Sequence, residues 1–287
     1  MATLPEDILQ VIPDHEIEKV YETFMQEWPK SAYHYGFLKT CYDWCKKNPT
    51  FDASFFHCES NKESGIFIGI LNSGHRTFGV IPYAKEGYEL QLKKVLMETK
   101  RIDWNKLPLL QGVLPRHYEL MEDVVKEKGF TTSMYCDSTI QLLDPKLAAD
   151  YDISCPDNVY VKKLTTEDNV DLIYERWTNK VIHTKEDIIN IIELSFAYGI
   201  FSKSDNELLA WVMLSHYGAI GTLYTMEHAR KCGYAKILIK IISKELVQEM
   251  IPIYTAIVVK NITSISLFQS IGFKQVGNFR YVNVVRN

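Results

Sequence analysis

The chain has 287 residues, of which 46% are hydrophobic and 24% are charged, and its net charge at neutral pH is −4. This length and apolar fraction are sufficient for two domains that each bury a core. Because the sequence has no basic block and no interleaved aromatic and basic residues, nucleic acid is not expected as a partner. No apolar run is long enough to span a membrane, so no membrane partner is expected either.

The N-terminal sequence contains acidic residues early and lacks both a secretory apolar region and an Arg-rich transit pattern. It therefore predicts a cytoplasmic protein. The six cysteines form no Cys-x-x-Cys pair, and Cys41 and Cys45 have no matching His or Cys pair elsewhere. We expect reduced, mostly buried thiols and no metal site.

The first half of the chain alternates helix-like and strand-like segments. Residues 5–30 carry apolar side chains at helical spacing, which predicts a helix. The elements expected after it are strands 66–71 and 77–81, helix 87–97, strand 109–114 and helix 118–128, which ends at Gly129-Phe130.

A segment with Pro145 and Pro156 follows and is the predicted linker. We place the domains at residues 1–145 and 159–287, with residues 146–158 between them. In the second domain, helices are expected to begin at the capping boxes of residues 165–168 and 184–187. The other elements expected there are strands 159–164, 199–202, 208–216 and 219–225, helix 234–249, strand 253–259 and a strand at 280–285 that closes the sheet.

The order of elements in the first half repeats in the second. The segment Ala84–Tyr88 lies where Ala229–Tyr234 lies later, and Gly129-Phe130 corresponds to Gly272-Phe273. We predict two copies of one fold, of which the first is degenerate, because it has lost one loop residue and carries Glu86, which would repel a phosphate. The alternative is a coincidence of two unrelated α/β units.

A compact loop, Arg230–Ala235, lies between the predicted strand 219–225 and the predicted helix 234–249. Its pattern is Arg-x-x-Gly-x-Ala. The free N–H groups at the start of a helix favour a phosphate or pyrophosphate, and Arg230 and Lys231 add positive charge.

A second pattern follows the predicted strand 253–259. It consists of Asn261, the small residue Ser264 three positions later, the aromatic residue Phe268 seven positions later, and Gly272-Phe273. Gly-Phe is typical of a helix that ends and returns the chain to a sheet.

Together the two patterns resemble the pyrophosphate loop and the following Asn motif of the GNAT superfamily of N-acetyltransferases. Trp211-Val212-Met213 and Leu223-Tyr224-Thr225 extend the resemblance to the glycine N-acyltransferase family, including insect members. The resemblance implies an α/β (α+β) fold of two tandem GNAT-like domains, each with a mixed twisted sheet flanked by helices. Vertebrate relatives are mitochondrial, which is the alternative location.

The resemblance also implies a site for acetyl-CoA or another acyl-CoA as co-substrate, without a metal. The residues implied to bind it are Leu223, Tyr224, Thr225, Arg230, Lys231, Cys232, Gly233, Tyr234, Ala235, Asn261, Ser264 and Phe268. A backbone N–H at a strand bulge, expected near Thr225, would stabilise the tetrahedral oxyanion. Phe268 stands where many GNAT enzymes have a Tyr that protonates the leaving thiolate.

The attacking amine must lose a proton, which requires a base. His228 is placed where glycine N-acyltransferases have a glutamate proposed as the base, and Glu227 is the neighbouring alternative. Both could also be solvated loop residues, with the proton of the amine lost through water. His216 and Tyr198 could face the cleft, although each is typical of a strand residue.

Three functions remain open from the sequence. The first is an acyl-CoA-dependent N-acyltransferase with a small-molecule amine acceptor, such as a glycine-like amino acid. The second is a non-catalytic acyl-CoA sensor, and the third is a protein or peptide N-acetyltransferase. The sequence predicts neither the acyl chain, nor the acceptor, nor the oligomeric state.

Overall fold

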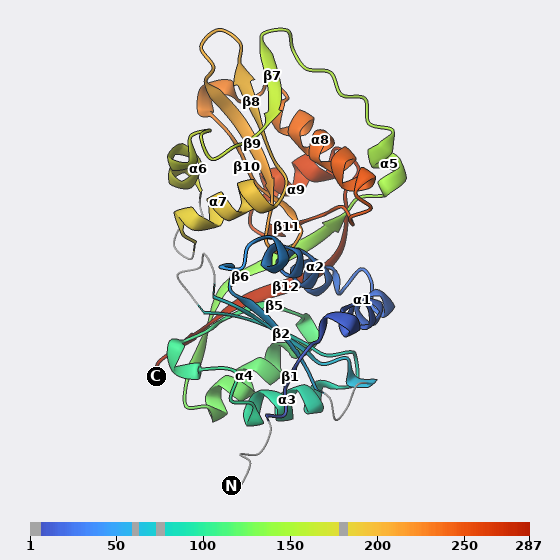
Figure 1. The fold of residues 1–287 in the computed structure, drawn as a ribbon, viewed down its shortest axis with the longest axis vertical. Helices are drawn as coiled ribbons and strands as arrows, with labels where there is room; N and C mark the ends of the chain where they lie inside the picture. The colour runs from blue at the N-terminus through green and yellow to red at the C-terminus, as the bar shows by residue number, and fades with distance from the viewer. Residues whose placement is uncertain (1–6, 59–62, 73–77, 178–182) are drawn as a thin grey trace.

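The structure is a computed structural model, and it describes residues 7–58, 63–72, 78–177 and 183–287. Within these residues the strands form one twelve-stranded mixed sheet in the order β1-β2-β3-β4-β5-β12-β6-β11-β10-β9-β8-β7, with helices on both faces (Figure 1). The α/β class predicted from the sequence is confirmed.

The elements of the first half are β1 (Gln10–Val11), α1 (Ile17–Gln26), α2 (Ala32–Lys47), β2 (Ala53–His57), β3 (Phe67–Leu71), β4 (Gly79–Tyr83), α3 (Glu89–Glu98), β5 (Leu109–Val113), α4 (Tyr118–Glu127) and β6 (Thr131–Leu142). Those of the second half are α5 (Pro145–Ala149), β7 (Val159–Lys163), α6 (Val170–Arg176), α7 (Lys185–Leu194), β8 (Ala197–Ser202), β9 (Leu208–Leu214), β10 (Ile220–Thr225), α8 (Tyr234–Gln248), β11 (Tyr254–Val258), α9 (Ile262–Gln269) and β12 (Lys274–Val285).

Most predicted elements are present, and the differences have physical reasons. The helix predicted over 5–30 is confined to α1, because the chain before it forms the edge strand β1. Helix α2 was missed because buried side chains such as Tyr33, His34 and Phe37 lie around much of its circumference, which hides the apolar stripe of a surface helix. Strand β6 was missed because runs of consecutive polar residues, Thr131–Ser133 and Asp137–Thr139, interrupt the alternation of polar and apolar residues that predicts a strand. The first residue of the strand predicted at 77–81 lies outside the described residues.

The two halves repeat one arrangement of strands. In the first, β2, β3 and β4 are antiparallel and β4 pairs in parallel with β5, with α3 between them. In the second, β8, β9 and β10 are antiparallel and β10 pairs in parallel with β11, with α8 between them. A helix commonly connects two parallel strands in this way. The prediction of two copies of one fold is therefore confirmed.

The last strand of each half lies against the other half. Strand β6 pairs with β11, with Leu142 opposite Tyr254, whereas β12 pairs with β5, with Arg280 opposite Val113. The two long strands also pair with each other. The prediction that strand 280–285 closes the second sheet is wrong, because β12 lies in the middle of the shared sheet. The proposed boundaries at residues 145 and 159 remain a prediction.

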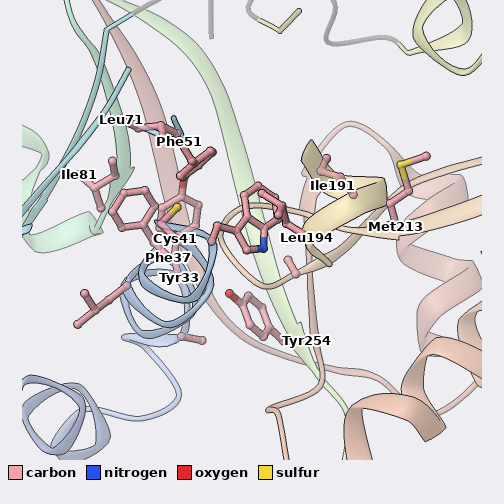
Figure 2. Close-up of a cluster of buried hydrophobic side chains, with 14 of the residues drawn as sticks. Tyr33, Phe37, Cys41, Phe51, Leu71, Ile81, Ile191, Leu194, Met213 and Tyr254 are labelled. Carbon is pink, nitrogen blue, oxygen red and sulfur yellow. The ribbon is translucent and has the colours of Figure 1, made fainter. Parts of the chain in front are cut away.

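A hydrophobic core joins the halves across this junction. Figure 2 shows Tyr33 and Phe37 of α2 in one cluster with Ile191 of α7 and Tyr254 of β11. Figure 1 places α2 between the two halves. At Gly36 the approach is so close that an added methyl group would overlap the Tyr254 hydroxyl and the Tyr217 carbonyl. Among the described helices, none is both long and apolar enough to cross a bilayer.

Candidate functional site

Strands β10 and β11 begin in parallel register and then separate. Ile220 lies opposite Thr255, and the Thr255 hydroxyl donates a hydrogen bond to the Ile220 carbonyl at 2.8 Å. The register of β10 against β9 shifts between Gly221 and Tyr224, and Thr222 has a positive φ of 46°. The bulge therefore lies at Thr222 and not near Thr225, where it was predicted, because Tyr224 and Thr225 have returned to regular pairing with β9.

A cavity of about 180 Å³ lies in the gap between β10 and β11. Trp177 from the end of α6 lines it together with Ser264 and Phe268 of α9. The two helices lie on opposite faces of the sheet, because Trp211 of β9 packs in the core cluster with α6 and α7, while its neighbour Val212 packs in the cluster with α8 and α9. The gap therefore runs through the sheet, and we refer to this cavity as the gap cavity.

The loop Arg230–Ala235 lies at the mouth of the gap and lines a second cavity of about 570 Å³, the loop cavity. Lys231 and Gly233 both have positive φ, 65° and 81°, and the helix α8 begins at Tyr234. This turn places the N-terminal N–H groups of α8 beside two exposed basic side chains. Such an arrangement favours the pyrophosphate of a nucleotide.

The predicted acyl-CoA residues come together at these two cavities. Leu223, Tyr224 and Ser264 line both, which makes the cavities contiguous. The other predicted residues that line one of them are Thr225, Arg230, Lys231, Gly233, Tyr234, Ala235, Asn261 and Phe268. Cys232 is exposed and is not among the lining residues. Within the described part of the chain, no cluster of three or more His, Cys, Asp or Glu residues could hold a metal ion.

Asn261 and Phe268 have structural contacts as well. The Asn261 side chain caps α9, where its Oδ1 accepts a hydrogen bond from the Ser264 N–H at 3.1 Å. Phe268 is buried, and its ring packs edge-on against Phe273 with the centroids 5.0 Å apart. Having no hydroxyl group, Phe268 offers no proton to a leaving group in the gap cavity.

The structure places the two predicted bases away from the gap. Glu227 and His228 lie in a short 3-10 helix after β10, and both are exposed. The His228 imidazole is 3.3 Å from the carboxylate of Glu207, which precedes β9. Neither residue is among those that line the gap cavity or the loop cavity.

A third cavity, of about 100 Å³, continues from the gap on the side of α7, and we call it the inner cavity. It shares Trp177, Gly221, Thr222 and Ala256 with the gap cavity. His183 and Asp187 line it, with Nδ1 of the imidazole 2.9 Å from the carboxylate. The predicted cleft residue His216 lines it too.

The His183–Asp187 pair was not among the site residues predicted from the sequence. Asp187 was expected only as part of a capping box at the start of α7, and that capping box is present. The missed signal is local: His183 directly precedes the N-cap residue Thr184, and the Asp187 oxygen that accepts a hydrogen bond from the Thr184 N–H at 3.0 Å also contacts the imidazole. Burial lowers the pKa of His183 to about 3, so its imidazole is neutral at physiological pH.

Comparisons with known proteins agree with this architecture. Residues 197–282 match the family described as FR47-like protein, and residues 8–124 match a domain of unknown function, DUF5645. The X-ray structure of a Drosophila protein has a TM-score of 0.88 at 18% identity, covering 98% of this chain and 100% of that chain. A search of curated proteins found no match.

Two further solved structures share the arrangement along nearly the whole chain. A tandem GNAT protein from the clavulanic acid biosynthesis pathway has a TM-score of 0.58 at 14% identity, covering 96% of this chain and 98% of that chain. The chain has a tandem GNAT fold. A GCN5-related N-acetyltransferase from Sphaerobacter thermophilus has a TM-score of 0.52 at 10% identity, covering 98% of this chain and 96% of that chain. With the FR47-like match, this tandem GNAT fold supports the GNAT superfamily.

Proposed function

We propose that this tandem GNAT protein is an acyl-CoA-dependent N-acyltransferase that acts on the amine of a small acceptor. The observation that carries the proposal is the gap cavity, which runs between β10 and β11 and is contiguous with the loop cavity at the start of α8. One ligand that is anionic at one end and extended at the other would fit both. Acyl-CoA, with a pyrophosphate and a pantetheine arm, has this form.

In the proposed complex, the pyrophosphate binds at the N–H groups that open α8, beside Arg230 and Lys231. The pantetheine arm lies along Leu223 and Tyr224, where backbone groups can pair with it as an added strand would. The thioester then lies near the bulge at Thr222, where a backbone N–H can stabilise the oxyanion of the tetrahedral intermediate.

The acceptor is proposed to be a small primary amine that enters a ternary complex and attacks the thioester directly. The small size of the inner cavity, about 100 Å³, favours an acceptor such as glycine over a bulky one. Assignment to the glycine N-acyltransferase family and the roles of His228 and Glu227 remain predictions from the resemblance.

A second candidate function is a non-catalytic acyl-CoA sensor. It is favoured by the exposed positions of Glu227 and His228 outside the gap, and by the absence of a hydroxyl group on Phe268. A sensor would need only the loop cavity and the gap cavity to bind its ligand.

Isothermal titration with acetyl-CoA and benzoyl-CoA, followed by thiol release with a panel of amines, tests these functions. Binding with amine-dependent thiol release supports the N-acyltransferase and ranks its acceptors. Binding without release from any free amine favours the sensor, unless peptides release thiol, which would identify a peptide acetyltransferase. An absence of binding would contradict the assignment of the loop.

A further inference from the structure

We propose that the inner cavity is the acceptor site and that His183 is the general base for the attacking amine, with Asp187 as its positioning residue. This inference rests on the proposed N-acyltransferase function. It replaces the exposed His228 with a buried histidine that lies next to the gap between β10 and β11.

The location of the pair is the first observation. His183 and Asp187 line a cavity that meets the gap cavity at Gly221 and Thr222, the residues where β10 bulges. An amine in the inner cavity would therefore face a thioester lying in the gap. His228 has no comparable position, because it is 57% exposed and paired with Glu207.

The orientation of the imidazole is the second observation. Its Nδ1 is 2.9 Å from the Asp187 carboxylate, so Nδ1 carries the proton and Nε2 carries the lone pair. The ring also stacks on Trp177, with the centroids 4.2 Å apart and the planes at 11°. Both contacts hold the ring in place, and the carboxylate stabilises the imidazolium that forms when the base takes a proton.

The surroundings keep the base neutral before the reaction. Among the described residues that line the inner cavity, the titratable side chains other than His183 are those of Asp187, of His216, whose ring is 6.2 Å away, and of Tyr217. The Tyr174 hydroxyl donates to the His183 carbonyl at 3.4 Å. Burial lowers the pKa of His183 and raises the pKa of Tyr217, so both are uncharged near neutral pH.

The proposed step transfers the acyl group from the sulfur of CoA to the nitrogen of the amine. The amine nitrogen forms a bond to the thioester carbon, and Nε2 of His183 takes one proton from that nitrogen. The carbon–sulfur bond then breaks, and the CoA thiolate takes up the proton that the imidazolium returns. The products are an amide and free CoA, so no acid from Phe268 is required.

The experiment compares His183→Asn, Asp187→Asn and His228→Asn with the wild-type protein, and His15→Asn serves as a control for an exposed histidine. For each protein, acetyl-CoA affinity is measured by titration and turnover by thiol release with the best amine. We expect His183→Asn to lose about 10²-fold in kcat while its acetyl-CoA affinity is kept. His15→Asn should behave like the wild type.

Two further measurements separate catalysis from a structural role. Added imidazole should restore part of the turnover of His183→Ala, because the deleted ring leaves room in the cavity. Asp187→Asn should lower kcat while acetyl-CoA affinity is kept, and Asp187→Glu, which keeps a carboxylate, should restore part of the turnover. A purely structural role for Asp187 would lower acetyl-CoA affinity and turnover together, with no recovery in Asp187→Glu.

The outcomes are distinguishable. If His183→Asn binds acetyl-CoA and keeps wild-type kcat, or if His228→Asn alone loses turnover, the inference is overturned and the proposed function stands. If His183→Asn no longer binds acetyl-CoA and imidazole restores nothing to His183→Ala, a structural role replaces the catalytic one. If the wild-type protein binds acetyl-CoA but acylates no amine, the proposed function fails and the inference fails with it.

Discussion

Arg116 and Glu27 form a largely buried ion pair, with Nη2 of Arg116 2.6 Å from the Glu27 carboxylate, at the loop between β4 and α3. The same carboxylate accepts hydrogen bonds from the Glu86 N–H and the Tyr83 hydroxyl, both at 2.8 Å. This loop corresponds in the first half to Arg230–Ala235 in the second. A carboxylate of the protein itself thus occupies the start of α3, in the place where the second half would hold a phosphate. This occupation accounts for the predicted degeneracy of the first half.

We therefore expect one acyl-CoA to bind per chain, at the second half. Gly233 and Gly87 form a matched pair, because both have positive φ, 81° and 88°, and at both an added Cβ would have no other atom within 4 Å. Gly233→Glu should abolish acetyl-CoA binding through charge repulsion, whereas Gly87→Glu should keep it, although both carry the same backbone strain. Titration calorimetry of both variants measures this. Equal loss of binding in both would contradict the assignment.

Glu27 should contribute to stability through its charge. Burial raises the pKa of Glu27. The hydrogen bonds from Glu86 and Tyr83 and the charge of Arg116 together lower this pKa by more than burial raises it, so the net shift is downward. Glu27→Gln should lower the free energy of unfolding by about 2 kcal/mol at neutral pH. Because the pKa in the folded state is lowered, this difference should be lost as the pH falls below about 4.3, the ordinary glutamate value.

Urea denaturation at neutral and acidic pH measures the effect of Glu27→Gln. The exposed Glu22 in α1, the helix that ends just before Glu27, provides the control, and Glu22→Gln should change stability by less than about 0.5 kcal/mol. If the Glu27→Gln variant is as stable as the wild type at neutral pH, the ion pair makes no net contribution to the free energy of unfolding.

Gly36 should be required for the two halves to dock. Replacing a helical glycine with alanine ordinarily stabilises a helix by about 0.5–1 kcal/mol. At Gly36 the added methyl group would overlap Tyr254 and Tyr217, so we expect Gly36→Ala to destabilise the protein by about 1–3 kcal/mol. Gly277→Ala is the matched control, because nothing lies within 4 Å of its Cβ position. Thermal unfolding of both variants measures this, and a higher melting temperature for Gly36→Ala would refute the close approach.

Buried histidines should make the protein sensitive to mild acid. Burial lowers the pKa of His34 to about 3 and that of His117 to about 4, and the Arg116 charge acts in the same direction on both. The unfolded chain binds protons at these histidines below about pH 6.5, while the folded chain does not. The free energy of unfolding should therefore be constant above about pH 6.5. As the pH falls below that value, the free energy of unfolding should decrease by up to about 1.4 kcal/mol per pH unit for each histidine.

Urea midpoints measured between about pH 7.5 and pH 5 test this dependence. The window is chosen because carboxylates with lowered pKa, such as Asp7 and Asp168, affect stability only at more acidic pH. His34→Gln should reduce the slope by about one proton. Constant midpoints across this range would show that the two histidines bind protons in the folded protein as they do in the unfolded chain, which would contradict the lowered pKa values.

The candidate acyl-CoA residues that line the two cavities could be proposed from the sequence because most of them are close together in the chain. Arg230–Ala235 and Asn261–Phe268 each cover the end of a strand-to-helix connection and part of the helix that follows, and local turn and capping preferences fix the shape of these connections. The repeat of the two halves could also be recognised from the order of their elements, because hydrophobic residues recur at one spacing in strands and at another in amphipathic helices.

Only the tertiary structure decided which strands of the two halves pair and which histidine lies beside the gap. The exchange of β6 and β12 depends on pairing between segments more than a hundred residues apart, for which no local preference exists. His183 reaches the gap because α7 packs against β9 while Gly221 and Thr222 bulge from β10. The sequence by itself determined the local motifs, since these depend on neighbouring residues. The inner cavity, which we propose as the acceptor site, depends on long-range packing that neighbouring residues do not specify.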